Sequence, residues 1–103
     1  MSDNFTAFST ISVDDVIEYL RISAEDLDES QRSLLGTMLE AAKNYVLHYT
    51  GRLSEYADSV PEFTIAVYAL CSDMYDKRTY QVDEKSSNKI VDSILDSRSV
   101  NLL

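Results

Sequence analysis

Glycine and proline are scarce in this chain, with two glycines and one proline among 103 residues. A β-sandwich or β-barrel needs many turns built from these two residue types, so their scarcity argues against a turn-rich β fold. Strong helix formers, above all leucine, alanine and glutamate, are frequent instead. The composition therefore favours an all-α fold, and a chain of this length has enough residues for one domain with one modest core.

The chain has only one cysteine and one histidine, and its net charge is negative. A single cysteine, Cys71, excludes an internal disulfide and a multi-cysteine metal site and favours a reducing compartment. The net charge of −9 argues against a protein that grips nucleic-acid phosphates or anionic lipid through a basic face. Residues 1–29 alone contribute −7, with Arg21 as their one basic residue, so the acidity is an N-terminal feature.

Long apolar runs are absent as well. The longest mostly apolar run, Phe63 to Cys71, is far shorter than the roughly 20 residues of a membrane span. Residues 1–10 have neither a basic start nor a continuous apolar segment, so we do not expect a signal peptide. No membrane partner is expected.

The apolar residues that are present recur at spacings of three and four, the period of an amphipathic helix. Ser12 with Asp15 three residues later indicates a capped helix start, and Pro61 indicates another. The two longest expected helices are each about 30 Å long and should pack as an antiparallel hairpin, with the shorter two laid against it. The expected helices span residues 13–21, 30–50, 61–80 and 87–96 of a domain at 12–97, between an N-terminal arm at 1–11 and a C-terminal tail at 98–103.

Residues 63–71 are apolar nearly all round, which indicates cover on more than one side of that helix. In so small a protein the second cover can be another subunit. Tyrosines are seven of the ten aromatic residues, and tyrosine suits both a protein interface and the rim of a small core. We take Ile65, Tyr68 and Tyr75 as the candidate subunit interface.

No catalytic or cofactor-binding constellation is found in the sequence. Cys71 lies on the apolar stripe and is expected in the core rather than as a nucleophile beside the single histidine, His48. The acidic run at residues 25–30 resembles a calcium loop, but Gln31 and Thr37 stand where that loop needs glycine and glutamate. We therefore expect no enzyme, no metal and no cofactor.

The segment NYVLHYTGR at residues 44–52 is predicted to be a helix end. Tyr45 and Tyr49 lie on the core stripe, and Gly51 suits the left-handed position that follows a helix. Arg52 can reach the last carbonyls of that helix. We expect a structural stop here, with Thr50, Gly51 and Arg52 as its landmark, and no ligand.

The order of these features is more specific than any one of them. The short helix SVDDVIEYLRI, the acidic link, the long helix ending EAAKNYVLHYTGR, the proline start of PEFTIAVYALCSDMYDKR and the last helix ending SILDSR follow one another over residues 12–98. This order resembles the small head–tail connector, or adaptor, proteins of tailed bacteriophages and related prophages. The arm before residue 12 and the tail after Arg98 lie outside the resemblance.

The resemblance implies an α-helical, non-enzymatic subunit of a ring, usually of twelve copies, under the portal protein at the DNA exit of the head. That location implies assembly in the host cytoplasm, a virion site at the head–tail junction, and a downstream connector or tail protein as the next partner. DNA would pass through the channel without specific binding. The family's C-terminal segment docks on the portal, and here that role would fall on Arg98, Val100, Leu102 and Leu103.

The negative charge of the N-terminal residues supports a second hypothesis, in which the protein is a regulator and not a structural subunit. An acidic soluble protein can regulate a partner by masking its basic, DNA-binding surface. That reading predicts binding that depends strongly on salt and on Asp26, Asp28 and Glu29.

Overall fold

The computed structural model describes residues 6–77 and 89–100. Over these residues the chain is all-α, as the composition indicated, with five α-helices, two 3-10 turns and no strand. Predicted helix residues 78–80 and 87–88 lie outside this range. In order the elements are η1 (Phe8–Thr10), α1 (Val13–Leu20), η2 (Ala24–Asp26), α2 (Glu29–Thr50), α3 (Ser54–Asp58), α4 (Pro61–Lys77) and α5 (Lys89–Arg98).

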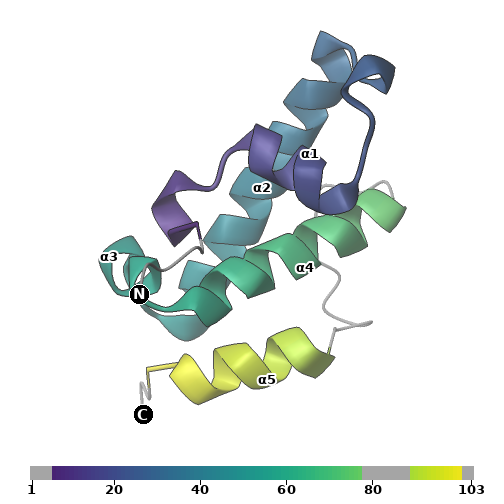
Figure 1. Cartoon of the computed structure of the whole chain (residues 1–103). Helices are drawn as coiled ribbons and strands as arrows, with labels where there is room; N and C mark the ends of the chain where they lie inside the picture. Colours follow the sequence, from purple (N-terminus) through teal and green to yellow (C-terminus); the bar gives the residue numbers. More distant parts are fainter. Residues whose placement is uncertain (1–5, 78–88, 101–103) are drawn as a thin grey trace.

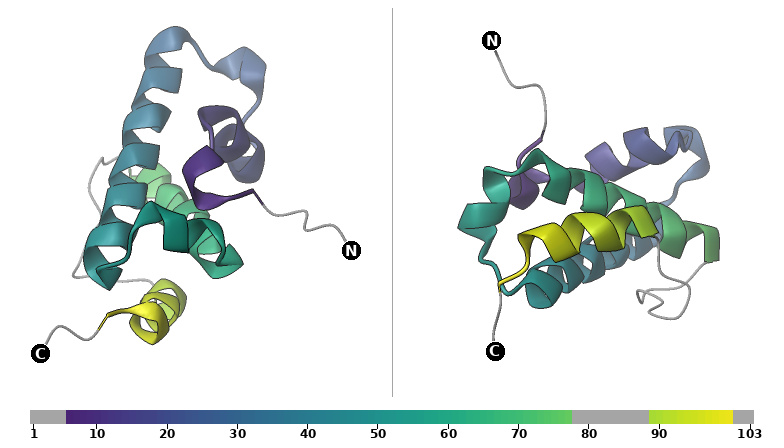
Figure 2. Two further views of the ribbon diagram at one scale, coloured as in Figure 1. Left: turned by 90° about the vertical axis from the view of Figure 1, so that its left-hand side faces the viewer. Right: turned by 90° about the horizontal axis from the view of Figure 1, so that it is seen from below.

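The framework is the predicted long hairpin of α2 and α4. The two helices meet where α2 ends and α4 begins, and α4 runs back across α2 (Figure 1). The short helix α1 packs on one side of α4 and α5 on the other (Figures 1 and 2). Much of the apolar surface of α4 is thus covered within one chain. The core contains Phe8, Ile11, Val16, Ile17, Leu35, Met38, Leu39, Ala42, Val46, Ala57, Val60, Phe63, Ala66, Val67, Leu70, Cys71, Met74, Val91 and Leu95.

Both helices of the N-terminal half begin with a capping box. The Ser12 hydroxyl accepts a hydrogen bond from the backbone N–H of Asp15, and the Asp15 carboxylate accepts one from that of Ser12. Asp28 and Gln31 form the same reciprocal pair at the start of α2. These bonds satisfy backbone donors that a helix end otherwise leaves unpaired. Asp28 and Gln31 therefore have a structural role within the run that resembled a calcium loop.

Part of the N-terminal arm is ordered by the cover that its apolar side chains find. Phe8 and Ile11 are buried, and the ring of Phe8 meets that of Phe63 edge to face at 6.5 Å. Ser9 donates two hydrogen bonds to the carboxylate of Asp58, from its backbone N–H and from its hydroxyl. Residues 6–11 therefore belong to the folded unit.

Two apolar residues that the spacing of three and four places on the core stripe of α2, Leu34 and Tyr49, are exposed. Leu34 is 39% exposed because the first turns of α2 project past α1 and α4 (Figure 1). Tyr49 is 38% exposed and leans on α5 instead of packing inward. The predicted stripe is therefore buried in the middle of α2, whereas one of its residues near each end of the helix stays exposed.

The two glycines give a matched pair of predictions. Gly51 follows α2 with a φ of 71°, a left-handed conformation that costs a non-glycine residue about 1 kcal/mol or more. Gly36 lies inside α2, where an added Cβ would lie 3.6 Å from Val13 Cγ2, an ordinary contact distance. We expect Gly51→Ala to lower the free energy of unfolding by about 1–2 kcal/mol. Gly36→Ala should raise it by up to about 1 kcal/mol.

Urea denaturation followed by circular dichroism measures both changes. A destabilised Gly36→Ala would mean that α1 packs more tightly on α2 than this geometry indicates. An unchanged Gly51→Ala would mean that the left-handed turn is not maintained in solution.

Candidate functional site

The predicted helix-end landmark lies beside Arg98 and Val100, two of the four predicted docking residues. The backbone N–H of Val100 donates a hydrogen bond of 2.8 Å to the carbonyl of Thr50. The Nε of Arg52 donates one of the same length to the carbonyl of Arg98. A Cβ at Gly51 would lie 3.6 Å from the Cβ of Val100. We call this group, Thr50, Gly51, Arg52, Arg98 and Val100, the C-terminal corner.

The local sequence explains why the corner forms there. The buried hydroxyl of Thr50 donates to the carbonyl of Val46 and accepts from the backbone N–H of Arg52. The left-handed turn at Gly51 then ends α2 with the Thr50 carbonyl available to Val100. Arg52 was expected to reach the last carbonyls of its own helix, and it reaches the last carbonyl of α5 instead.

The guanidinium of Arg98 is partly exposed and bonds to two residues of its own chain. Its Nη1 donates to the hydroxyl of Tyr56 and its Nη2 to the carboxylate of Glu62, each at 3.3 Å. These two hydrogen bonds raise the pKa of Arg98 above its ordinary value. Arg52 lies over the same tyrosine, with its guanidinium carbon 4.2 Å from the ring centre of Tyr56. Tyr56 and Glu62 are thus structural supports that sequence reasoning missed.

A second contact attaches α5 to the end of α2. The hydroxyl of Tyr49 donates a short hydrogen bond of 2.5 Å to the carboxylate of Asp96. This hydrogen bond raises the pKa of Tyr49 to about 12, with burial and the charges of Asp96 and Asp92 acting in the same direction. Tyr49 therefore keeps its proton well above the ordinary tyrosine range near 10.

The Tyr49 contact makes stability depend on alkaline pH. Because the folded-state pKa is raised, the contribution is fully present below pH 10 and is lost as the pH rises toward 12. At neutral pH we expect Tyr49→Phe to lower the free energy of unfolding by about 0.5–1 kcal/mol, since the contact is solvent-accessible. Urea denaturation from pH 7 to 12 should show the difference between native chain and variant vanishing toward pH 12. A difference that stays constant with pH would contradict the assignment.

The three candidate interface residues occupy two different environments along α4. Ile65 is 54% exposed, and Tyr68, one turn further on, stacks on Tyr19 of α1 with ring centres 4.7 Å apart. Tyr19 is itself 49% exposed. Burial raises the pKa of Tyr68, while a hydrogen bond with Thr6 opposes that rise. The exposed Ile65 and Tyr19 and the partly buried Tyr68 form an apolar surface that we call the aromatic face.

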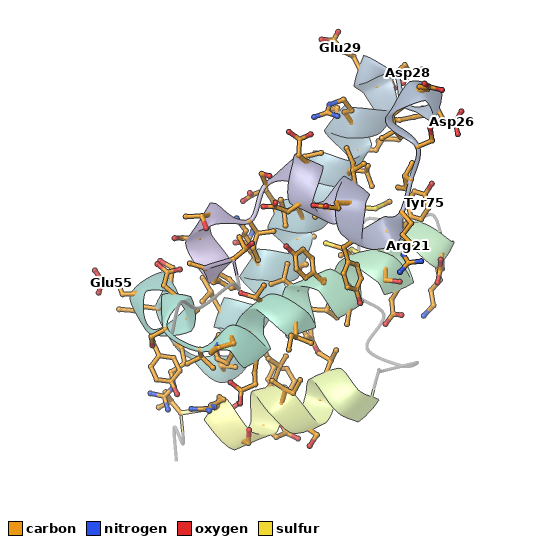
Figure 3. The ribbon with its side chains drawn as sticks, viewed as in Figure 1. Arg21, Asp26, Asp28, Glu29, Glu55 and Tyr75 are labelled. Atoms are coloured by element: carbon orange, nitrogen blue, oxygen red, sulfur yellow. The ribbon has the colours of Figure 1, made fainter. Side chains whose placement is uncertain are left out.

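Tyr75 lies apart from that face, near the end of α4 (Figure 3). It lines a small groove of about 130 Å³ beside the first half of α2. The groove is mostly apolar, which is consistent with a protein contact and too small for a drug-sized ligand. Its lining residues are Leu27, Gln31, Leu34, Leu35, Met38 and Tyr75.

Three acidic residues of the N-terminal part of the sequence lie at the end of the molecule opposite α3. Asp26, Asp28 and Glu29 extend into solvent around the start of α2, whereas Glu55 lies on α3 at the far end (Figure 3). These three carboxylates of residues 1–29 are therefore grouped at one end of the fold (Figure 3). No cluster of three or more metal-binding side chains is present in residues 6–77 and 89–100.

Cys71 is buried, as predicted, and its pKa is raised by burial to about 12. A thiol in that state is a poor nucleophile at neutral pH. His48 is exposed near the end of α2. Among the described residues, no helix is both long and apolar enough to cross a membrane.

The family model for phage gp6-like head-tail connector proteins matches residues 10–98. The chain belongs to this head-tail connector family. The match covers the five α-helices of the described residues and stops at Arg98. It is close to residues 12–98, over which the order of motifs in this connector resembles the family. Searches of the curated proteins and of the solved structures give no significant match.

Membership of a structural connector family accounts for several features of the connector's surface. Exposed apolar side chains such as Ile65, Tyr19 and Leu53 are typical of surfaces that contact other proteins. Leu102 and Leu103, the other two predicted docking residues, lie outside the described residues. Residues 99–103 also lie beyond the family match.

Proposed function

We propose that this connector subunit assembles into a ring, usually of twelve copies, under the portal protein of a tailed phage or prophage. The ring extends the DNA channel and presents a surface to the next connector or the tail. The family match over residues 10–98 is the observation that supports this proposal most strongly. The subunit works by binding and positioning, with no covalent chemistry, at the head–tail junction of the virion after assembly in the host cytoplasm.

The C-terminal segment, residues 98–103, is the proposed portal-docking element. The C-terminal corner supports this because it fixes the start of that segment through two backbone carbonyls, those of Thr50 and Arg98. A fixed start reduces the entropy that binding must remove from the segment. In this proposal Arg98 acts by holding the corner through Tyr56 and Glu62, while Val100, Leu102 and Leu103 supply apolar contacts.

The aromatic face is the proposed contact between neighbouring subunits, with the groove at Tyr75 as a second contact area. Ile65 supports this because its side chain is more than half exposed, whereas the other large apolar side chains of α4 are buried or partly buried within the chain. Exposed apolar groups on a small subunit are most simply explained by burial in an assembly.

The acidic charge fits a channel protein. A negative surface does not hold passing DNA by its phosphates, so movement through the ring is not hindered by binding. The net charge of −9 per chain is repeated in every copy of the ring.

Co-purification with the portal tests the docking proposal. The purified chain is mixed with assembled portal particles, and bound chain is measured by sedimentation. We expect the double variant Leu102→Ala, Leu103→Ala to lose most binding, while the neighbouring Asn101→Ala keeps it. Equal binding of both variants would refute docking through the two leucines.

A further inference from the structure

Leu53 is the most exposed large apolar side chain among those that the structure describes, at 73%. It precedes α3 as the N-cap residue, with φ −95° and ψ 160°, and its side chain makes no capping hydrogen bond. Aspartate, asparagine, serine or threonine at that position would accept a bond from the first turn and stabilise the helix. The leucine therefore contributes neither to the core nor to the helix start.

The backbone of Leu53 is nevertheless well fixed. Its carbonyl accepts hydrogen bonds from the N–H groups of Tyr56 and Ala57, at 3.0 and 3.1 Å. The preceding residue, Arg52, is held by the carbonyl of Arg98 and by the ring of Tyr56. The side chain of Leu53 is thus exposed to solvent, while its backbone is already ordered before any partner binds. An apolar side chain on an ordered backbone is typical of an anchor residue in a protein interface.

Leu53 lies at the place where the C-terminal segment leaves the domain. Val100 packs beside Gly51 and is 36% exposed. Gly51 precedes Leu53 by two residues in the sequence. We call Leu53 and Val100 the apolar step. Leu102 and Leu103 follow Val100 by two and three residues, and chain segments of that length span at most about 7 and 11 Å. A partner that holds these leucines is therefore within reach of the step.

We propose that the apolar step docks on the portal together with Leu102 and Leu103, with Leu53 as a rigid anchor of that interface. This inference rests on the proposed docking function and extends it to a residue far from the C-terminal segment in sequence. The fitting partner surface is an apolar cleft of a protein. The exposed apolar side chains of Leu53 and Val100 favour a protein surface over a phosphate-rich partner such as nucleic acid or a lipid headgroup.

The deciding variant is Leu53→Asp in the full chain. Aspartate is a preferred N-cap residue, so the melting temperature should stay the same or rise. Portal binding, measured by sedimentation with assembled portal particles, should fall at least about tenfold because a charged group replaces the anchor. Loss of affinity without loss of stability is a result that a purely structural role of Leu53 would not give.

Two matched variants accompany it. Ser54→Asp places the same charge one residue away at the exposed start of α3 and should bind like the native chain. Leu53→Met keeps an apolar side chain of similar volume and should also bind normally. Native affinity in Leu53→Asp, a lowered melting temperature in that variant, or an equal loss in Ser54→Asp would each overturn the proposal.

The leucine variants of the segment separate this inference from the docking proposal. Loss of binding in Leu53→Asp with normal binding in the double variant Leu102→Ala, Leu103→Ala would support docking through the apolar step and refute docking through the two leucines. The reverse pattern would refute docking through the apolar step and support docking through the two leucines. A native chain that does not bind assembled portals would refute both.

Discussion

Replacing Phe63 by alanine is expected to remove about 3–5 kcal/mol from the free energy of unfolding, the largest effect of any single truncation considered. Phe63 is fully buried at the start of α4, and its ring meets both Phe8 of the N-terminal arm and Tyr56 of α3 edge to face. Small domains have only about 5–15 kcal/mol of total stability. The variant should therefore be unfolded at mild urea concentrations or in water.

Urea denaturation followed by circular dichroism measures this effect. Ile65→Ala is the matched control, because Ile65 lies two residues further along the same helix and is more than half exposed. It should change the free energy of unfolding by no more than about 0.5–1 kcal/mol. A Phe63→Ala variant as stable as Ile65→Ala would mean that the N-terminal arm and α3 do not pack on α4 as described.

Replacing Ile65 by aspartate is expected to abolish ring formation on the portal while the chain stays folded. In the proposed ring, the carboxylate would be buried in the contact between neighbouring subunits, where an unpaired charge costs several kcal/mol per contact. Because that contact recurs around the ring, the cost recurs with it. In the isolated chain the same carboxylate lies in water, so the melting temperature should change little.

Electron microscopy of portal particles incubated with the variant measures the loss. Ser93→Asp is the control, since Ser93 is exposed on α5, away from the aromatic face, and the charge change is the same. Rings formed as readily by Ile65→Asp as by Ser93→Asp would exclude the aromatic face as a subunit contact. Rings lost in both variants would show that added negative charge, wherever it lies, prevents assembly.

Features encoded by neighbouring residues were predictable from the sequence. The capped start at Ser12 and Asp15, the proline start at Pro61 and the glycine stop at Gly51 each depend on residues within one turn of a helix. The periodicity of apolar residues located the hairpin of α2 and α4 and placed Cys71 in the core. These signals are local, so a single amino-acid sequence contains them in full.

The five-residue helix α3 was not predicted, and its residues were assigned to a link. It begins with a leucine at the N-cap and is too short to show an apolar period, so none of the usual start signals is present. The second capping box was also missed, because Asp28 and Gln31 were considered as calcium-loop positions. Polar residues at the right spacing support more than one interpretation until the helix boundary is known.

The C-terminal corner could not be found from the sequence because its contacts join distant residues. Arg52 and Arg98 are 46 positions apart, and Arg98 and Glu62 are 36 apart. No spacing rule pairs such residues, and only the packing of α5 beside the end of α2 brings them together. The resemblance to connectors indicated Arg98 and Val100, whereas the exposure of Leu53 became visible only in the folded chain.

The most direct test of the connector assignment is electron microscopy of purified portal particles with and without this chain. The proposed function predicts an additional ring of density on the portal, at the end where DNA leaves the head, with one copy of the chain bound per portal subunit. A chain that is monomeric alone is compatible with this result, because the portal can template the ring. Portal particles that show no added ring at saturating chain concentration would contradict the assignment.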